Sequence, residues 1–427
     1  MNRPQDLKTP GRGWLRSSRR LGLILLVIGL AAYFLLPAFA APPASNYDSL
    51  RLYTEALFEV SQKYVWPKNE EELMYGSLRG MMNSLDPDSS FLTAKEYQNY
   101  LQGVKGSPAE ACMDMIVKDG LLTAVCVIDD GPAARAGLKP DDHIIKIDGQ
   151  MVRNLTTQEA ARRFQGAPGT AFKLQVIRSG EVKPLDLTVT LEPLNGKTVT
   201  TGYLDNAVAY VRIRYFNDET PVELAKVLNN IKQHKPAVKG IILDLRNNAR
   251  GSLEEAVRSA SLFLGNQQIV IAKGRSPKTE QSYSGKDRDL VFKTLPPMVV
   301  LVDQGTARAA EILAAALRDQ ARATLLGSKT LGLCGLTKAF PLEDGSALVM
   351  TVAQCYSPKG AKIPGKGLEP EVPGKKLSAA KAPEKASAPE KAPAPVVSPE
   401  QDPWVLQAKD LLISGKPKPV APKKPAA

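Results

Sequence analysis

Histidine is almost missing from this chain of 427 residues, which has two histidines beside 56 basic and 44 acidic side chains. His143 lies in a β-rich stretch, and His234 lies at the end of a predicted helix. A Ser–His–Asp triad needs an imidazole between the nucleophile and the carboxylate. The sequence therefore argues against a histidine-based triad, and we expect neither a metal ion nor a cofactor.

A basic segment in the middle of the chain is also lacking. The net charge is +12, but much of the surplus lies in residues 1–20 and in the lysine-rich end of the chain. Nucleic-acid-binding proteins usually carry a basic stripe or basic residues mixed with aromatic ones, so we expect no nucleic-acid partner. There is no internal repeat. A chain of this length, with 43% hydrophobic residues, has room for two or three folded domains.

The N-terminus has the pattern of an export signal. Basic residues in 1–20 precede a charge-free run from Leu21 to Ala41, which is about the ~20 residues needed to cross a bilayer. Basic residues before such a run stay in the cytoplasm, so the body of the chain is expected outside it. Two interpretations remain open: an uncleaved transmembrane anchor, or a signal peptide cleaved after the small-residue motif that ends at Ala40.

The four cysteines of an exported body are candidates for disulfide bonds. Cys112 and Cys126 lie at equal distances from Asp119, so a hairpin centred on that turn would place them opposite each other. Cys334 and Cys355 flank a second turn signal, Glu-Asp-Gly. Each bridge would stabilise the fold by roughly 2–4 kcal/mol. The alternative of four buried thiols stays open.

Periodicity and composition divide the exported body into four regions. Residues 47–103 show helical spacing, and residues 104–193 form a β-rich module of short strands. Strands and helices alternate over 194–374, which favours a layered α/β core. Residues 375–427 are rich in Ala, Pro and Lys and are predicted to be disordered, with one docking helix expected at 402–413.

Six stretches resemble motifs of one family, in the same order and with the same spacing. The first three are LDPDSSFLT (85–93), which resembles LDPHSxYL; GPAARAGLKPDDHIIKIDG (131–149), which resembles a PDZ-domain signature; and GIILDLRNNARGSLEEAV (240–257), which resembles gliLDLRnNPGGlLxxAV. The others are LVDQGTARAAEILAAALRD (301–319), GSKTLGLCGL (327–336) and SPKGAKIPGKGLEPEV (357–372). Over roughly residues 50–373 the chain is similar to the carboxyl-terminal processing (tail-specific) serine peptidase family.

The resemblance implies an α+β multidomain fold. N-terminal helices would be followed by a PDZ-like β module, inserted before a crotonase/ClpP-like α/β peptidase core. Members of the family cleave proteins near their carboxyl termini with a Ser–Lys dyad that a glutamine assists. A serine hydroxyl is a weak nucleophile until a base takes its proton, and a lysine can be that base only when burial lowers its pKa.

The three catalytic positions of that family carry other residues here. Arg308 stands at the nucleophile position, the second serine of GSASASE, Leu333 replaces the lysine of TFGKG, and Thr337 replaces the glutamine. A guanidinium stays protonated and is not nucleophilic, and leucine cannot accept a proton. The oxyanion region implied by the resemblance comprises Arg250 (in place of a glycine), Gly251 and Ala309.

Nearby residues offer two other nucleophiles, Thr306 and Cys334. Thr306 fits better as a helix cap, and a disulfide to Cys355 would consume Cys334. The remaining hydroxyl and amine candidates nearby are Ser328, Lys329 and Lys338. The PDZ-like module lacks the glycine run of a carboxylate-binding loop at 106–114, so tail binding and a purely structural role both remain open for it.

We therefore expect an envelope pseudopeptidase that binds or scaffolds exported proteins, or their C-terminal tails, without cleaving them. Its location would be the bacterial inner membrane, as a single-pass protein with its body in the periplasm or cell envelope, or the periplasm if the signal is cleaved. The alternative function is an active serine-type C-terminal processing endopeptidase with a non-family nucleophile. A homo-oligomer, or a hetero-oligomer with an active paralogue, is a further hypothesis. The two arginines of the cleft would bind a carboxylate or simply fill solvated space.

Overall fold

The computed structural model describes residues 46–414, apart from short gaps at 104–108, 119–120, 153–159, 162, 195, 206 and 295 and a longer gap at 376–397. The basic segment 1–20, the apolar run 21–41 and most of the expected tail lie outside the described residues. Among the helices that are described, none is long and apolar enough to cross a membrane.

The chain divides into two compact units, one ending at Met74 and the other beginning at Tyr75. The first unit contains helix α2 (Asn46–Lys63) and the start of α3 (Glu70–Asn83). The Tyr53 hydroxyl donates a hydrogen bond to the Met74 sulfur, at 3.2 Å, within this unit. Helices thus form where the apolar spacing of residues 47–103 predicts them.

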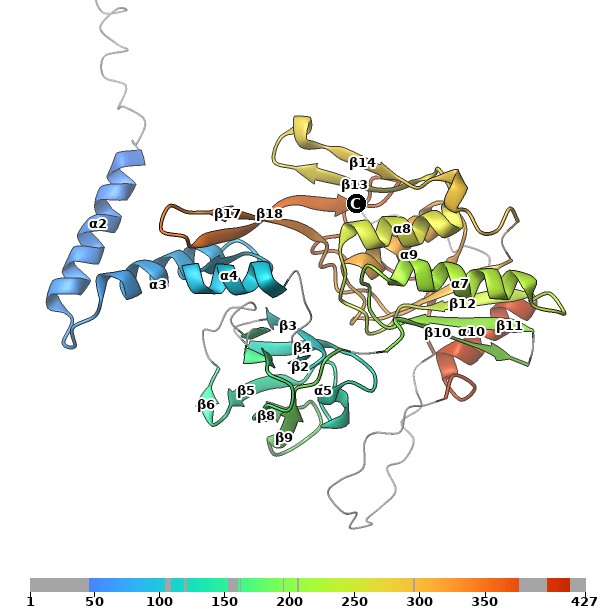
Figure 1. The fold of residues 1–427 in the computed structure, drawn as a ribbon, viewed down its shortest axis with the longest axis horizontal. Coiled ribbons are helices and arrows are strands. Elements are labelled where there is room, and N and C mark those ends of the chain that lie inside the picture. The colour runs from blue at the N-terminus through green and yellow to red at the C-terminus, as the bar shows by residue number, and fades with distance from the viewer. Residues whose placement is uncertain are drawn as a thin grey trace, which may run out of the picture. The chain divides into compact units, whose positions relative to one another are not determined.

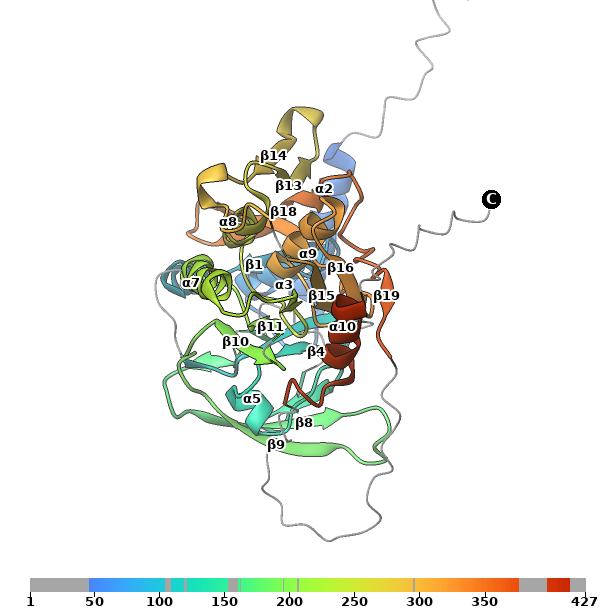
Figure 2. The same ribbon diagram turned by 90° about the vertical axis from the view of Figure 1, so that its right-hand side faces the viewer.

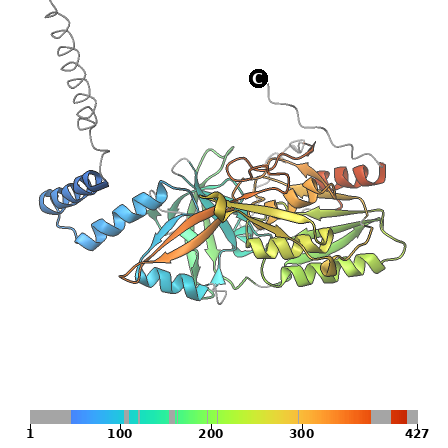
Figure 3. The same cartoon turned by 90° about the horizontal axis from the view of Figure 1, so that it is seen from above.

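The second unit opens with the end of α3, strand β1 (Ser90–Leu92) and helix α4 (Ala94–Gly103). Strand β1 pairs antiparallel with β18 (Ala347–Tyr356), which also pairs with β17 (Gly335–Pro341). The long hairpin of β17 and β18 lies beside α4 (Figure 3), and Tyr97 and Tyr100 of that helix pack against buried Ala347 and Val349. This contact fixes the segment 85–93 against the peptidase-like part of the chain.

The β-rich module is an antiparallel sheet with the strand order β3-β4-β5-β8-β9, and β6 pairs with β5 (Figure 1). Its strands are β3 (Met113–Lys118), β4 (Leu121–Val127), β5 (His143–Ile147), β6 (Gln150–Met151), β8 (Ala171–Ile177) and β9 (Leu185–Thr190). The short strands β2 (Ala109–Glu110) and β7 (Gln165–Gly166) form a separate pair, and α5 spans Pro132–Arg135. Alternate residues of β8 are buried (Phe172, Leu174 and Val176), as the two-residue period of a half-buried strand requires.

The α/β core is built on a six-stranded sheet with the order β10-β11-β12-β15-β16-β19. The pairs from β11 to β19 are parallel, and β10 is antiparallel to β11. The strands are β10 (Val199–Leu204), β11 (Val208–Ile213), β12 (Gly240–Asp244), β15 (Met298–Val302), β16 (Thr324–Gly327) and β19 (Val372–Pro373). β12 is fully buried, which explains its continuous apolar sequence GIIL.

Helices cover both faces of this sheet (Figure 2). Ile241 and Leu243 of β12 pack with α7 (Thr220–Gln233), α8 (Leu253–Leu264) and α9 (Ala309–Asp319), whereas Ile242 packs with α10 (Pro403–Ser414). A second sheet has the order β1-β18-β13-β14, with β13 at Gln268–Gly274 and β14 at Gln281–Ser284. Two 3-10 turns complete the core, η2 (Pro277–Thr279) and η3 (Asp287–Asp289).

Candidate functional site

The turn between β15 and α9 holds Arg308, which the motif comparison aligns with the family nucleophile. Thr306 is fully buried and fixes this turn, because its hydroxyl lies 2.9 Å from the Leu245 carbonyl oxygen and 3.1 Å from Asp303 Oδ1, and it accepts from the Asp303 N–H. Arg308 then caps α9 with φ +50° and ψ −117°. A non-glycine residue rarely adopts such a conformation, and a tight contact network must hold it there.

The side chain of Arg308 is bonded on two sides. Its guanidinium donates to the Ala249 carbonyl oxygen and to Asp88 Oδ1, both at 2.8 Å. Burial alone would lower the pKa of Arg308, but the charge of Asp88 raises it above its ordinary value. The group at the nucleophile position is thus a paired cation without a lone pair to donate.

The sequence analysis did not single out Asp88 as a partner of Arg308. The two residues are 220 positions apart and make an ion pair in which the side chains are 27% (Arg308) and 12% (Asp88) exposed. The sequence did contain a sign of this partner, because Asp88 occupies the position that is histidine in the LDPHSxYL pattern. A new acid at that position is the complement that a new arginine in the cleft requires.

Leu333 lies next to Arg308, as the motif spacing predicts. The Arg308 N–H donates to the Leu333 carbonyl oxygen at 2.9 Å. The Leu333 side chain packs on the buried cluster that contains Cys126, Tyr215 and Ala249. Thr337 lies farther along, exposed on β17 and opposite Thr351. None of these contacts supplies an amine base to the position of Arg308.

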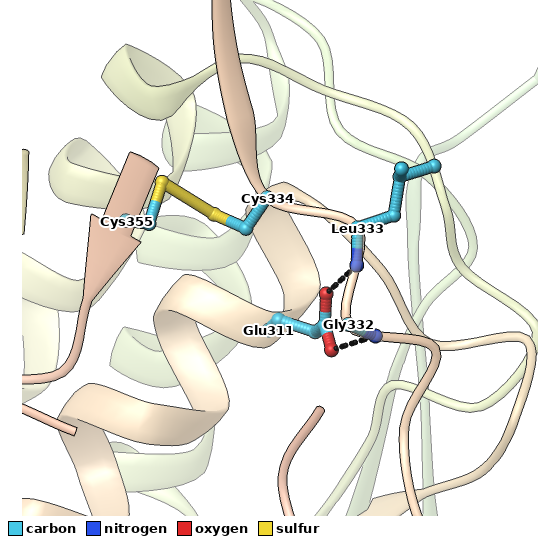
Figure 4. The surroundings of a disulfide bond; sticks show 5 residues. All are labelled: Glu311, Gly332, Leu333, Cys334 and Cys355. Carbon is cyan, nitrogen blue, oxygen red and sulfur yellow. Dashed lines mark hydrogen bonds between the residues drawn. A yellow bond between two sulfur atoms is a disulfide. The ribbon is translucent and has the colours of Figure 1, made fainter. Parts of the chain in front are cut away.

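Glu311 holds the segment that carries Leu333. Its buried carboxylate accepts from the N–H of Gly332 at 2.7 Å and from the N–H of Leu333 at 3.0 Å (Figure 4). The Thr330 hydroxyl also donates to it. Burial raises the pKa of Glu311 to about 7, although these donors act in the opposite direction. In Figure 4 the Leu333 side chain points away from this carboxylate. Glu311 therefore fixes the backbone of the former lysine loop.

Gly251 and Ala309, which the motif comparison assigns to an oxyanion region, lie on two closely packed backbone segments. Gly251 has φ +113°, and a Cβ there would lie 2.3 Å from Phe216 Cβ and 3.0 Å from Ala309 Cβ, so this position requires glycine. α8 begins immediately afterwards with a capping box between Ser252 and Glu255. In the described part of the chain, the N–H groups of Gly251 and Ala309 have no hydrogen-bond acceptor. Two adjacent amides are thus free to bind an oxygen atom.

Arg250 does not point a free guanidinium into this region. It donates to Glu110 Oε1 at 2.6 Å, to Asp114 Oδ2 at 2.9 Å and to the Met113 carbonyl oxygen at 3.0 Å. Burial would lower its pKa, but Asp114 and then Glu110 raise it. The residue that replaces a glycine of the turn is therefore a clamp between the α/β core and strands β2 and β3 of the β-rich module.

The same turn makes further bonds to the β-rich module. The Val127 N–H donates to Asn247 Oδ1 at 2.8 Å, and the Asn247 side-chain amide donates back to the Val127 carbonyl oxygen. The Cys126 thiol donates to the Asn247 carbonyl oxygen at 3.1 Å. The end of β4 is thus fastened to the segment that forms the oxyanion region.

The cysteines divide into one bridge and two thiols. Cys334 and Cys355 form a disulfide (Figure 4), whereas Cys112 and Cys126 are free and buried. The pairing of Cys112 with Cys126 expected from the sequence is wrong. A register shift in the hairpin places Asp114, not Cys112, opposite Cys126. Burial raises the pKa of Cys112 to about 11 and raises that of Cys126 further.

Comparison with known proteins decides the family. Sequence models of peptidase family S41 and of the PDZ domain match residues 207–373 and 123–178. The chain is 32% identical over 330 residues to a carboxy-terminal-processing protease of Bartonella bacilliformis, covering 77% of this chain and 75% of that protein. The chain belongs to peptidase family S41. The predicted fold, with a PDZ module and an S41 peptidase core, is confirmed.

Two further proteins are similar to the chain. Carboxy-terminal processing protease CtpA of Bacillus subtilis is 32% identical over 341 residues, which cover 79% of this chain and 71% of the relative. The solved structure of a photosystem II D1 C-terminal processing protease matches with a TM-score of 0.64 and 24% identity, over 75% of this chain and 92% of that one. The latter likeness concerns the fold alone.

Two cavities of similar size meet at Arg308. The groove cavity, of about 420 Å³, lies between the β-rich module, including its strand β3, and the turn that carries Arg250. The inner cavity, of about 430 Å³, lies between α8, α9, β14 and β17. Asp88, Gly251 and Arg308 line both. Thr337 also lines the inner cavity, so Arg308 and Thr337 face the same cavity although no hydrogen bond joins them.

The other nucleophile candidates are not free in this S41 chain. Thr306 is fully buried and bonded, and Cys334 is consumed by its disulfide. Ser328 and Lys329 are exposed and line neither cavity, and Lys338 lies over the Phe340 ring. The two histidines contact Thr123 (His143) and Tyr203 (His234).

Proposed function

We propose that this S41 chain is a non-cleaving member of its family, which binds exported proteins or their C-terminal tails and does not hydrolyse them. The observation that carries the proposal is the ion pair of Arg308 with Asp88 at the nucleophile position. An acyl transfer by this family's chemistry needs an alcohol and a neutral amine at that place. The guanidinium and the Leu333 side chain provide neither.

The contacts of the other candidates weigh against the alternative of an active endopeptidase. Thr306 donates within a buried turn and is inaccessible to a substrate, and Cys334 is bonded to Cys355. Removing a single member of a catalytic set costs several powers of ten in rate. Here all three members are replaced at once.

Retained architecture supports the binding of tails. The relatives in Bartonella and Bacillus are named carboxy-terminal processing proteases. β3 lies at the end of its sheet and lines the groove cavity through Met113 and Met115. An edge strand next to a cavity can accept an extended peptide by strand addition. A cleft that keeps this groove and loses its nucleophile is suited to binding alone.

The location and the domain limits of the sequence analysis belong to the same proposal. The run 21–41 would anchor the chain in a bacterial inner membrane or direct its export, with the PDZ-like module (104–193) and the peptidase-like core (194–374) in the envelope. A homo-oligomer or hetero-oligomer would be compatible with a scaffolding role.

Restoration of the family residues tests the proposal. The substrate is an unfolded protein with an apolar C-terminus, and intact mass spectrometry measures its truncation. We expect no truncation by the wild type and clear truncation by the triple variant Arg308→Ser, Leu333→Lys and Thr337→Gln. A matched control carries Ala in place of the new serine and must stay inactive. Truncation by the wild type in proportion to its concentration would overturn the proposal.

A restored variant that stays inactive calls for one further change. Arg250 occupies a glycine position and holds β2 and β3 against the turn of Gly251. We therefore add Arg250→Gly to the triple variant. Activity of this quadruple variant would identify the clamp as a second block, and the wild type must still be inactive for the proposal to hold.

A further inference from the structure

The ion pair of Arg308 with Asp88 lies where the groove cavity and the inner cavity meet. Both residues line both cavities, together with Gly251. The bond is monodentate, since the guanidinium reaches Asp88 Oδ1 and spends a second donor on the Ala249 carbonyl oxygen. Arginine has five N–H donors, and 27% of this side chain is exposed. Arg308 thus retains donors for another acceptor.

Backbone donors lie at the same place. The N–H groups of Gly251 and Ala309 have no acceptor among the residues described, and Ala309 opens helix α9. The N-terminal end of a helix carries a partial positive charge that favours an anion. A carboxylate that replaced Asp88 on Arg308 would pair with the same guanidinium and would gain backbone donors that Asp88 does not use, while the Asp88 carboxylate would have to turn toward solvent.

The inner cavity offers an apolar environment next to these donors. Four apolar or aromatic side chains line it (Leu253, Tyr283, Ile312 and Leu336), beside the polar side chains of Ser252, Glu254 and Thr337. Its volume of about 430 Å³ lies within the range of sites that bind small ligands, which are mostly apolar with a few placed polar groups. An apolar side chain could therefore be buried within reach of a bound carboxylate.

We infer that Arg308 is the receptor for the free α-carboxylate of a protein tail that enters through the groove cavity, displaces Asp88, and places its last, apolar side chain in the inner cavity. The inference rests on the proposed function, because it assigns the tail-binding site. In this view Asp88 is a built-in competitor that occupies Arg308 when no tail is bound. The nucleophile position has become a binding position.

Fluorescence anisotropy with the purified full chain tests this site. The probes are a labelled short peptide that ends in two leucines with a free carboxylate, and the same peptide as a C-terminal amide. We expect the wild type to bind the free acid more tightly. Arg308→Gln should weaken binding of the acid roughly tenfold to a hundredfold, because a charge-assisted bond is lost, and should leave the amide unaffected.

Asp88→Asn should change the affinity for the free-acid peptide in the opposite direction. It removes the competitor and keeps the hydrogen-bonding shape, so we expect the free acid to bind about tenfold more tightly or better. Arg288→Gln is the matched control, since Arg288 is highly exposed and lines neither cavity. It should behave as the wild type does.

The outcomes separate the two claims. Suppose that the wild type binds the free-acid peptide. If Arg308→Gln then still prefers the free acid over the amide, or if Asp88→Asn does not bind the free acid more tightly, the assignment of Arg308 is wrong while tail binding stands. If neither the wild type nor Asp88→Asn binds the acid peptide, tail binding and the assignment fail together.

Discussion

The clamp of Arg250 predicts a measurable coupling between the β-rich module and the α/β core. Its guanidinium bonds Glu110, Asp114 and the Met113 carbonyl oxygen, and the three charged side chains are 12–21% exposed. Breaking a fully buried ion pair costs roughly 3–5 kcal/mol. Because some solvent reaches these groups, we expect Arg250→Gln to lower the free energy of unfolding by about 2–4 kcal/mol.

A double-mutant cycle isolates the contribution of this clamp. Arg250→Gln and Asp114→Asn are measured singly and together by urea unfolding, and residues in one ion-pair network show coupling energies of roughly 0.5–3 kcal/mol. Hydrogen exchange at β2 and β3 should rise in the Arg250 variant, because these strands lose their contact with the core.

The control for the cycle is an exposed ion pair of the same module. Arg135 and Glu192 are 45% and 50% exposed, so Arg135→Gln should cost less than about 1 kcal/mol. A coupling energy near zero between Arg250 and Asp114, with unchanged exchange at β2 and β3, would refute the clamp.

Three further predictions concern stability and thiol chemistry. Replacing Cys334 and Cys355 by serine should lower the free energy of unfolding by about 3 kcal/mol, because the bridge closes a loop with a separation of 21 residues; an unchanged midpoint in urea would contradict this. Cys112 and Cys126 are buried with raised pKa values, so Ellman's reagent should react with them only after unfolding, and fast labelling of the native chain would argue against their burial. The raised pKa of Glu311, about 7 against an ordinary 4.5, means that the folded chain holds a proton more tightly than the unfolded chain. The stabilising effect of the protonated Glu311 side chain is present below about pH 4.5 and is lost as the pH rises through 7. The free energy of unfolding should therefore fall between these pH values in the wild type and fall less steeply in Glu311→Gln. An identical slope in the variant would contradict the raised pKa of Glu311.

Short motifs predicted which residues of this region lie close together. Arg308 and Leu333 lie in motifs with fixed spacing, and the structure places the Arg308 N–H on the Leu333 carbonyl oxygen. Gly251 was singled out from the turn motif, and its positive φ with the close approach of Phe216 explains why that glycine is needed. Such features depend on short stretches of chain, which a single sequence displays directly.

The partners of the two arginines could not be read in the same way. Asp88 and Arg308 are 220 residues apart, and Glu110 and Arg250 are 140 apart. No periodicity links residues at such distances, because their contact depends on how two sheets and a turn pack. The error at Cys112 has two causes. The strands pair Lys118 with Leu121, so the hairpin is not centred on Asp119, and the register shift between Asp114 and Met115 moves the facing residues by one more position.

Hydrolysis in water enriched in the heavy isotope of oxygen tests the central claim most directly. The purified wild-type chain is incubated at equimolar ratio with an unfolded protein that has an apolar C-terminus, and mass spectrometry reads the isotope in every carboxyl terminus of the substrate. Because the proposal assigns Arg308, paired with Asp88, to the position of the family nucleophile, the account predicts an intact substrate without incorporated isotope. Heavy oxygen at new or original termini, in an amount that scales with the concentration of the chain, would contradict it.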